Sequence, residues 1–493
     1  MPKDFLKRSR SADVDVYLGY HQRETFTLQL VDVLVPNIHR LRQLHLDESL
    51  CDGMPTFYSR LNVAAPKLTS LSIISDKHSF QFPAPGSDAL PSLFVGEMPA
   101  LRKLFLTYYT RWPSGYFQNL THLCLMNQCD AQPMSRPSTS EFLDFLELSP
   151  QLQYLFIGRA GPTRRTEDDV PVPSPDRTIC LESLRELNIY GWSNDTITRF
   201  LSHLSLKVST GLHIWCLYPT AFEESENDQS FFPGDSSELH NLQNITELVF
   251  IRAQYTPRNY FHFCLQDSRL YIQGALAYQD LEGILSHCNL GKVEQFFVHD
   301  LIDPGKHPFA VSKWRNIFRK LPAMTKLSLL VHMPHSTMSR VILSNLFPQN
   351  LEGLASGTKS APCSDPNVEL LCPDLETIYI EQDATLPILF ISGLADARAR
   401  HGKPLQRLQL VYRSISLDTP VPLRSESGSS HSDSDVEDDE FDREVTNKDF
   451  TILRDHVHEV TVDSESDYVT SFPDFGPRVV FKEWINFDNH DML

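Results

Sequence analysis

The strongest constraint on the fold is a sequence phrase, Pro-x-Leu-x-x-Leu-x-Leu/Ile, that recurs along the chain. It stands at Pro66–Ile73, Pro99–Leu106, Pro150–Ile157, Pro322–Leu329 and Pro373–Ile380, with Met or Ile in place of one leucine in the last two. A chain of this composition is expected to contain about one such match by chance, so the recurrence indicates an internal repeat. Repeat units of this size bury their apolar sides against one another.

The end of the phrase predicts a short β-strand. Side chains alternate along a strand, so its two apolar residues share one face and the residue between them lies on the other. Proline suits the start of the phrase because it fixes φ. Its missing N–H is not needed there for a hydrogen bond between strands. The same triplet without proline begins at Leu41, Leu120, Leu184, Ile245, Val293, Leu405 and Val457, and Leu212–Leu217 and Leu270–Ile272 fill two wider gaps.

Helical patterns lie between the predicted strands, at Ser138–Leu146, Asn194–Leu204, Gln279–Cys288 and Lys313–Leu321. The first begins with Ser138 and Glu141, spaced as in a capping box. A strand, a loop and a helix in about 30 residues match one long leucine-rich repeat. We therefore predict an α/β fold: a leucine-rich-repeat solenoid, an irregular curved arc with a parallel inner sheet and outer helices. It should be irregular because the inner asparagine ladder of regular repeats is mostly missing.

The predicted organisation has four parts: an N-terminal stub (1–24), the solenoid (25–415), an acidic, serine-rich disordered insertion (416–448), and a C-terminal strand and tail (449–493). Residues 424–444 contain nine acidic and two basic residues, and have too few apolar side chains to offset the entropy of ordering. Ser430, Ser432 and Ser434 each stand three positions before an acidic residue. They are candidates for acidophilic phosphorylation, and a plain solvated insertion is the alternative.

Composition excludes several classes of protein. The formal net charge is −19, which disfavours binding to nucleic acid. The sequence has no apolar run of 18 residues, so we expect no membrane span. The N-terminus lacks the apolar core of a signal peptide, and the nine cysteines show no CxxC spacing. Reduced thiols in a cytoplasmic or nuclear protein are therefore expected.

Several segments resemble a known family. Phe5–Val16 looks like the segment that follows the F-box in mushroom-type fungal F-box proteins, and Ile38–Leu46 resembles the first repeat of those proteins. Leu181–Ile189 and Thr196–Leu201 are similar to later repeats. The F-box itself, with its L-P-x-E helix start, is missing. The resemblance implies the substrate-recognition part of a ubiquitin-ligase adaptor, which would join a Skp/cullin complex only if an upstream F-box exists. A free-standing leucine-rich-repeat scaffold is the alternative.

The sequence predicts binding rather than catalysis. No nucleotide-binding, serine-hydrolase or zinc-protease motif is found in it, so we expect no enzyme activity, no cofactor and no metal. The concave surface should instead capture an unidentified protein target, because exposed aromatic residues are common in interfaces. The candidate partner-binding residues lie within or just past the strands: His45, Phe105, Tyr108, Tyr109, Trp112, Phe156, Asn188, Tyr190, Trp192 and Tyr379. The alternative for each of them is packing against a neighbouring loop.

Overall fold

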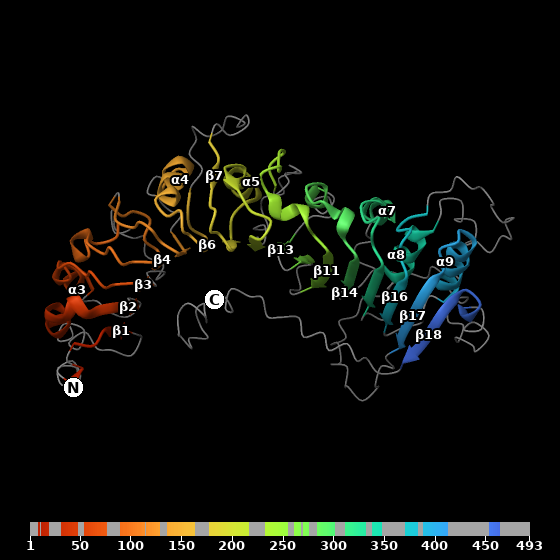
Figure 1. Ribbon diagram of the computed structural model, residues 1–493, viewed down its shortest axis with the longest axis horizontal. Helices are drawn as coiled ribbons and strands as arrows, with labels where there is room; N and C mark the ends of the chain where they lie inside the picture. The colour runs from red at the N-terminus through yellow and green to blue at the C-terminus, as the bar shows by residue number, and fades with distance from the viewer. Residues whose placement is uncertain are drawn as a thin grey trace, which may run out of the picture.

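A computed structural model describes most of the repeat region (Figure 1). The described residues are 8–9, 11–18, 31–47, 54–75, 89–113, 115–128, 136–162, 177–215, 232–254, 261–267, 270–275, 283–300, 311–331, 338–347, 370–382, 388–412 and 453–463. The predicted insertion at 416–448, with Ser430, Ser432 and Ser434, lies outside them.

The main element of the fold is one sheet of 16 strands. The strands are β1 (Val14–Leu18), β2 (Leu41–Asp47), β3 (Ser70–Ile74), β4 (Lys103–Thr107), β5 (His122–Met126), β6 (Tyr154–Gly158), β8 (Glu186–Tyr190), β10 (Gly211–Trp215), β11 (Glu247–Gln254), β12 (Phe261–Asp267), β13 (Leu270–Ala275), β14 (Gln295–Asp300), β15 (Lys326–Val331), β16 (Thr377–Gln382), β17 (Leu405–Tyr412) and β18 (Val457–Asp463). Apart from the pairs that β12 makes, all neighbouring strands run parallel.

The helices lie along the outer side of the curved sheet (Figure 1). They are α3 (Met54–Arg60), α4 (Thr139–Glu147), α5 (Asn194–Ser202), α7 (Val311–Arg319), α8 (Met338–Leu346) and α9 (Ile388–Arg400), with 3-10 turns η1 (Val35–Arg40), η2 (Phe94–Gly96), η5 (His240–Gln243) and η6 (Leu290–Lys292). Two short strands, β7 (Ile179–Cys180) and β9 (Leu204–Ser205), form a separate parallel pair. Helices beside a mostly parallel sheet confirm the predicted α/β class.

The recurring phrase forms the strands in register. Leu44 on β2 pairs with Leu71 on β3, Leu71 with Leu104 on β4, and Leu104 with Leu123 on β5. These four side chains are no more than 1 % exposed and belong to the main core, the large apolar cluster between the sheet and the outer elements. The alternation read from the sequence therefore places the leucine rows in the core, as predicted.

The start of the outer helix α4 is determined by its local sequence. The Ser138 hydroxyl accepts a hydrogen bond from the Glu141 amide, and the Glu141 carboxylate accepts one from the Ser138 amide at 2.7 Å. This capping box satisfies two backbone donors that a helix start leaves without partners. Phe142, Leu143 and Leu146 then turn toward the main core, which confirms the predicted helix.

The order of strands in the middle of the sheet differs from the prediction of a uniformly parallel sheet. The order runs β10, β13, β12, β11, β14, so the strand at Leu270–Ile272 lies beside β10 and not between β11 and β14. The strand β12 was not predicted, and it pairs antiparallel with both β11 and β13. An antiparallel meander needs only short connections, whereas a parallel step needs a crossover of a dozen or more residues.

Strands also extend the sheet at both ends. β1 pairs in parallel with β2, within the segment that we had assigned to an N-terminal stub. β18 pairs in parallel with β17, which confirms that the chain rejoins the sheet after the acidic segment. The sheet therefore reaches past both predicted limits of the solenoid, residues 25 and 415.

Candidate functional site: the inner face of the sheet

The inner face is the side of the sheet that carries the residue between the two core residues of each strand. From β1 to β13 the strand register places these residues in one row: Tyr17, His45, Ser72, Phe105, Cys124, Phe156, Asn188, His213 and Tyr271. Figure 1 shows the described helices on the opposite side of the sheet. Because side chains alternate along each strand, this inner face is separate from the face that packs into the main core.

An apolar cluster lies on this face, separate from the main core. The inner-face cluster consists of Ile74, Phe105, Cys124, Met126, Phe156, Trp215 and Tyr271, with Tyr190 packed against it. The Trp215 ring lies 6.4 Å from that of Phe156 and 5.5 Å from that of Tyr271. These ring distances fall within the range of favourable aromatic pairs. The cluster therefore continues across the strands from β3 to β13.

The inner-face candidates are more buried than we expected. The exposed fractions are 2 % for His45, 7 % for Phe105 and 0 % for both Phe156 and Asn188. Adjacent parallel strands stand about 4.8 Å apart, so bulky side chains in one row cover one another. The expectation of exposed aromatic residues was wrong for these positions, and their part in partner binding stays a prediction.

Tyr379 belongs to a smaller cluster further along the same face. It packs with Leu330 and Val411, and its hydroxyl donates to the Glu381 carboxylate at 2.6 Å. Both Tyr379 and Glu381 are buried. Tyr379 is therefore held by its own neighbours and was also wrongly expected to be exposed.

Four candidates just past the strand ends lie away from the inner face or are buried. Tyr109 and Trp192 belong to the main core, and Trp112 packs against it with its ring 5.2 Å from that of Phe145. Trp192 is anchored by a hydrogen bond from Nε1 to the Ala160 carbonyl at 2.7 Å. Tyr108 is 3 % exposed. The alternative of packing against neighbouring loops thus describes Tyr109, Trp112 and Trp192 better than a shared surface does.

Tyr190 is the candidate that meets the original expectation best. It is half-buried at the end of β8 and packs against the inner-face cluster. The Arg159 guanidinium lies 5.6 Å from its ring centre, within reach of a cation–π interaction. Tyr190 is thus a partly exposed aromatic side chain with a neighbouring cation at the edge of the cluster.

Polar atoms without hydrogen-bond partners are enclosed in this surface. Among the described residues, the buried side-chain oxygen and nitrogen of Asn188 and the indole nitrogen of Trp215 have no partner. The buried hydroxyl of Ser72 has none either. A buried polar group without a partner costs about 1–3 kcal/mol. These enclosed groups therefore reduce the stability of the fold by an amount that the described side chains do not offset.

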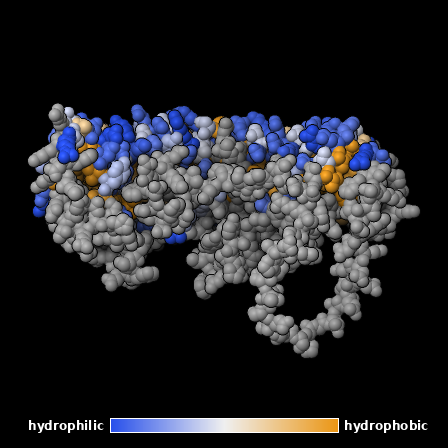
Figure 2. All heavy atoms as spheres, turned by 90° about the horizontal axis from the view of Figure 1, so that it is seen from below, coloured by the Kyte–Doolittle hydropathy of each residue, from blue (hydrophilic) through white to orange (hydrophobic). Residues whose placement is uncertain are grey.

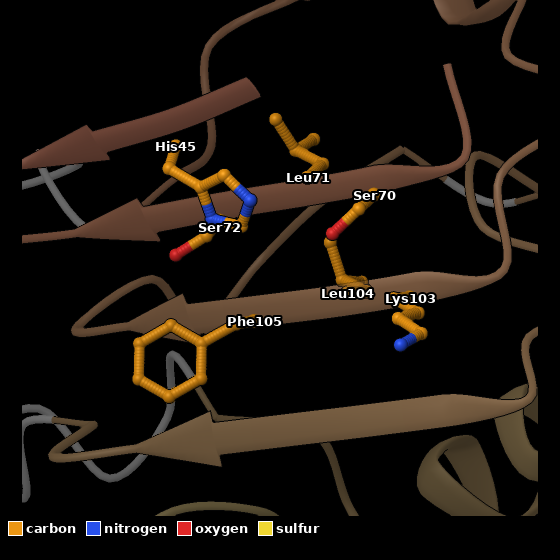
Figure 3. Close-up of a pocket in the computed structure, with 7 residues that line it drawn as sticks. All are labelled: His45, Ser70, Leu71, Ser72, Lys103, Leu104 and Phe105. Atoms are coloured by element: carbon orange, nitrogen blue, oxygen red, sulfur yellow. The ribbon is translucent and has the colours of Figure 1, made fainter. Parts of the chain in front are cut away.

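The described surface has one small hollow on the inner face, near its N-terminal end (Figure 3). It is lined by His45, Ser70, Leu71, Ser72, Lys103, Leu104 and Phe105, and its volume of about 240 Å³ includes space open to solvent. Binding sites for small organic ligands usually measure about 300–1,000 Å³. Because the volume of this hollow includes open solvent, its enclosed space is smaller than such a site, and an extended surface describes the inner face better.

The hydrophilic residues lie at the margin of the described surface. Figure 2 views the molecule from below the arc of Figure 1 and shows mostly polar described residues along one edge, with a few apolar patches among them. Lys103 is exposed at the start of β4, while Phe105 two residues later is buried. The described edge of this face is therefore polar where the inner-face cluster ends at Lys103.

Three histidines on this face are predicted to make the fold acid-sensitive. Burial lowers the pKa of His45, His122 and His213 from 6.5 to about 4. In the unfolded chain they take up protons near pH 6.5, so the unfolded state binds more protons between about pH 6.5 and 4. Stability should therefore fall as the pH falls through this window.

Urea unfolding at pH 7 and pH 5 measures this effect. We expect His45→Gln to reduce the loss of stability between the two pH values. His39→Gln is the matched control, because His39 is exposed. An equal pH dependence in the His45→Gln variant and the wild type would contradict the assignment.

The described ranges also bear on metal binding and on membrane insertion. No group of three or more His, Cys, Asp or Glu side chains there is arranged to hold a metal ion. No helix in the same part of the chain is long and apolar enough to cross a membrane.

Comparisons with known proteins add no identity. No protein-family model matches the chain, and no curated protein matches it in sequence.

Sequence reasoning missed several members of the inner-face cluster. Ile74, Met126 and Trp215 each follow the second core residue of their strand, as Tyr190 does on β8, but of these four positions we had selected only Tyr190. Strand alternation places these later residues on the same face. The period of two therefore contained the signal for these residues and also for Tyr271, which lies between Leu270 and Ile272.

Proposed function

We propose that this chain is a non-catalytic leucine-rich-repeat solenoid that binds another protein on its inner face. The observation that carries the proposal is the inner-face cluster, an apolar and aromatic surface on the side of the sheet opposite the main core. A single core-forming face would be enough for folding. Tyr190, half-buried at the edge of this second cluster beside Arg159, is the aromatic side chain that supports binding most directly.

The role that we propose for such binding is substrate recognition for an F-box type ubiquitin ligase in the cytoplasm or nucleus. The support is the resemblance of Phe5–Val16 and Ile38–Leu46 to fungal F-box proteins. Contact with a Skp/cullin complex would require an F-box. The second candidate is a free-standing scaffold, and co-purification of Skp and cullin with the protein in its native cells distinguishes the two.

Replacement of Tyr190 tests the binding surface. Full-length wild-type protein and the variants Tyr190→Ala and Leu148→Ala are used for quantitative affinity capture. Loss of an aromatic anchor commonly weakens binding about tenfold or more. We therefore expect Tyr190→Ala to lose specific partners that Leu148→Ala retains, since Leu148 is 41 % exposed and follows α4 on the outer side. Equal capture by both variants would contradict the proposal, and equal melting temperatures verify that both are folded.

A further inference from the structure

The same backbone turn recurs at the ends of four neighbouring strands. The residue that follows β4, β5, β6 and β8 has a left-handed conformation, with φ between 47° and 73°. Its amide donates in each case to the carbonyl of the last residue of the next strand, at 2.7–2.9 Å. The four residues are Tyr108, Asn127, Arg159 and Gly191. Because the turn repeats, the side chains at this position can be compared directly.

Arg159 is the member of this set that folding explains least. Glycine adopts the left-handed conformation freely, and asparagine tolerates it better than most residues. Gly191 makes the same hydrogen bond without any side chain. Tyr108 is buried beside Tyr109, so its packing offsets the backbone cost. Arg159 is exposed, so packing in the core does not offset that cost.

The fold places the ring of Tyr190 next to Arg159. Gly158 on β6 pairs with Tyr190 on β8, and a Cβ atom at Gly158 would lie 3.4 Å from the Tyr190 ring and 2.9 Å from the Phe156 ring. The glycine therefore leaves room for the Tyr190 ring beside it. The Arg159 guanidinium lies 5.6 Å from the centre of this ring. An exposed cation–π contact of this kind offsets only part of the backbone cost.

Both side chains carry hydrogen-bond donors that the described chain leaves without acceptors. Within the described ranges, the Arg159 guanidinium makes no ion pair or hydrogen bond, and the Tyr190 hydroxyl makes no hydrogen bond. The first described acidic residue after the ends of β6 and β8 is Asp195, in the first turn of α5. Other exposed arginines, such as Arg42 and Arg400, pair with an acidic residue of this chain.

We propose that Arg159 and Tyr190 together hold a carboxylate side chain, Asp or Glu, of the partner protein. This inference rests on the proposed function and names the chemistry of the partner. A guanidinium that stacks on a ring keeps N–H donors in its own plane, where a carboxylate accepts two of them. Arginine and tyrosine are also the residue types on which binding energy in interfaces most often depends.

A carboxylate fits this edge better than a phosphate does. Proteins usually bind phosphorylated segments through clusters of arginines. At the described ends of strands β5 to β10, Arg159 is the exposed arginine, whereas Arg136 is buried and donates to the Gly161 carbonyl at 3.0 Å. One exposed guanidinium matches the two oxygens of one carboxylate.

Selection from a phage library of random 12-residue peptides tests the proposal on the full-length protein. Peptides whose binding is lost in Tyr190→Ala are retained and synthesised. We expect them to contain Asp or Glu, and we expect replacement of that residue by Asn or Gln to weaken binding about tenfold or more. A version with phosphoserine at the acidic position is measured beside them. Binding more than tenfold tighter for phosphoserine would assign the site to phosphorylated partners and overturn the proposal.

Arg159 variants test the role of the guanidinium. Arg159→Asn keeps a residue that tolerates the left-handed turn, and it should weaken the same peptides about tenfold or more. Arg400→Asn makes the same change on the outer helix α9 and should leave their affinity unchanged. A selection repeated on Arg159→Glu should enrich Lys and Arg in place of Asp and Glu.

A stability measurement separates a binding role from a structural one. Arg159→Gly should weaken the peptides, yet its urea midpoint should be no lower than that of the wild type, because glycine relieves the left-handed turn. Val95→Gly is the matched control: Val95 is 55 % exposed with φ 55° in η2, so it should change stability without changing peptide affinity. A lower midpoint for Arg159→Gly would show that the fold requires this arginine, and would contradict the proposal.

The outcomes also separate this inference from the proposed function. Peptides that depend on Tyr190 but lack acidic residues, or that bind Arg159→Asn as tightly as the wild type, would overturn the carboxylate site alone. A selection that yields no peptide dependent on Tyr190 would count against both the site and binding by the inner face.

Discussion

Replacement of Leu104 by Asp is expected to unfold the repeats around β4. Leu104 is 1 % exposed and pairs with Leu71 and Leu123 in the core row. Removal of a buried leucine side chain costs about 2–5 kcal/mol, and an unpaired buried carboxylate adds several more. Typical domain stabilities are about 5–15 kcal/mol. Because each repeat is stabilised by its neighbours, the damage should spread to adjacent strands.

Urea unfolding followed by circular dichroism measures the effect. Leu148→Asp is the matched control, since it makes the same chemical change at a leucine that is 41 % exposed. We expect the control to cost less than about 1 kcal/mol. A midpoint for Leu104→Asp equal to that of the control would show that the leucine rows do not face the core.

Replacement of Arg398 by Ala is expected to have the second-largest effect. Arg398 on α9 is fully buried and donates to four backbone carbonyls before β16, those of Leu371, Cys372, Pro373 and Leu375, at 2.8–3.4 Å. Burial lowers the pKa of its guanidinium to about 10. The variant leaves these carbonyls without their donor and opens a cavity, which together should cost about 3–5 kcal/mol.

The control for this prediction lies on the same helix. Arg400 is exposed and forms an ion pair with Asp396, four residues earlier. Pairs of this kind contribute about 0.3–0.5 kcal/mol, so Arg400→Ala should barely change the free energy of unfolding. Equal effects of the two substitutions would contradict the role of Arg398 in joining α9 to the start of β16.

Local sequence patterns predicted the strands and several helices because they depend on short-range rules. Strand alternation placed Leu44, Leu71 and Leu104 in the core, and the spacing of Ser138 and Glu141 located the start of α4. Each of these predictions depends only on the alternation of side chains along a strand or on helix capping, both of which involve residues within about ten positions of one another.

Features that depend on distant segments were not predictable in the same way. The antiparallel strand β12 lies between β11 and β13, so these three strands follow one another in reverse chain order within the sheet. No periodicity in the local sequence specifies that order. The burial of Phe156 and Asn188 likewise depends on side chains from neighbouring repeats. Tyr109 and Trp192 pack inward, which the sequence left open because an aromatic residue after a strand packs equally well inward or outward.

Site-specific cross-linking to a partner tests the central claim most directly. In cells that contain the partner, the full-length chain carries p-benzoylphenylalanine either at Tyr190, beside the inner-face cluster, or at Leu148, on the outer side. We predict a covalent adduct with a separate protein from position 190 and none from position 148. Adducts from position 148 alone would place the partner on the outer side and contradict capture by the inner face.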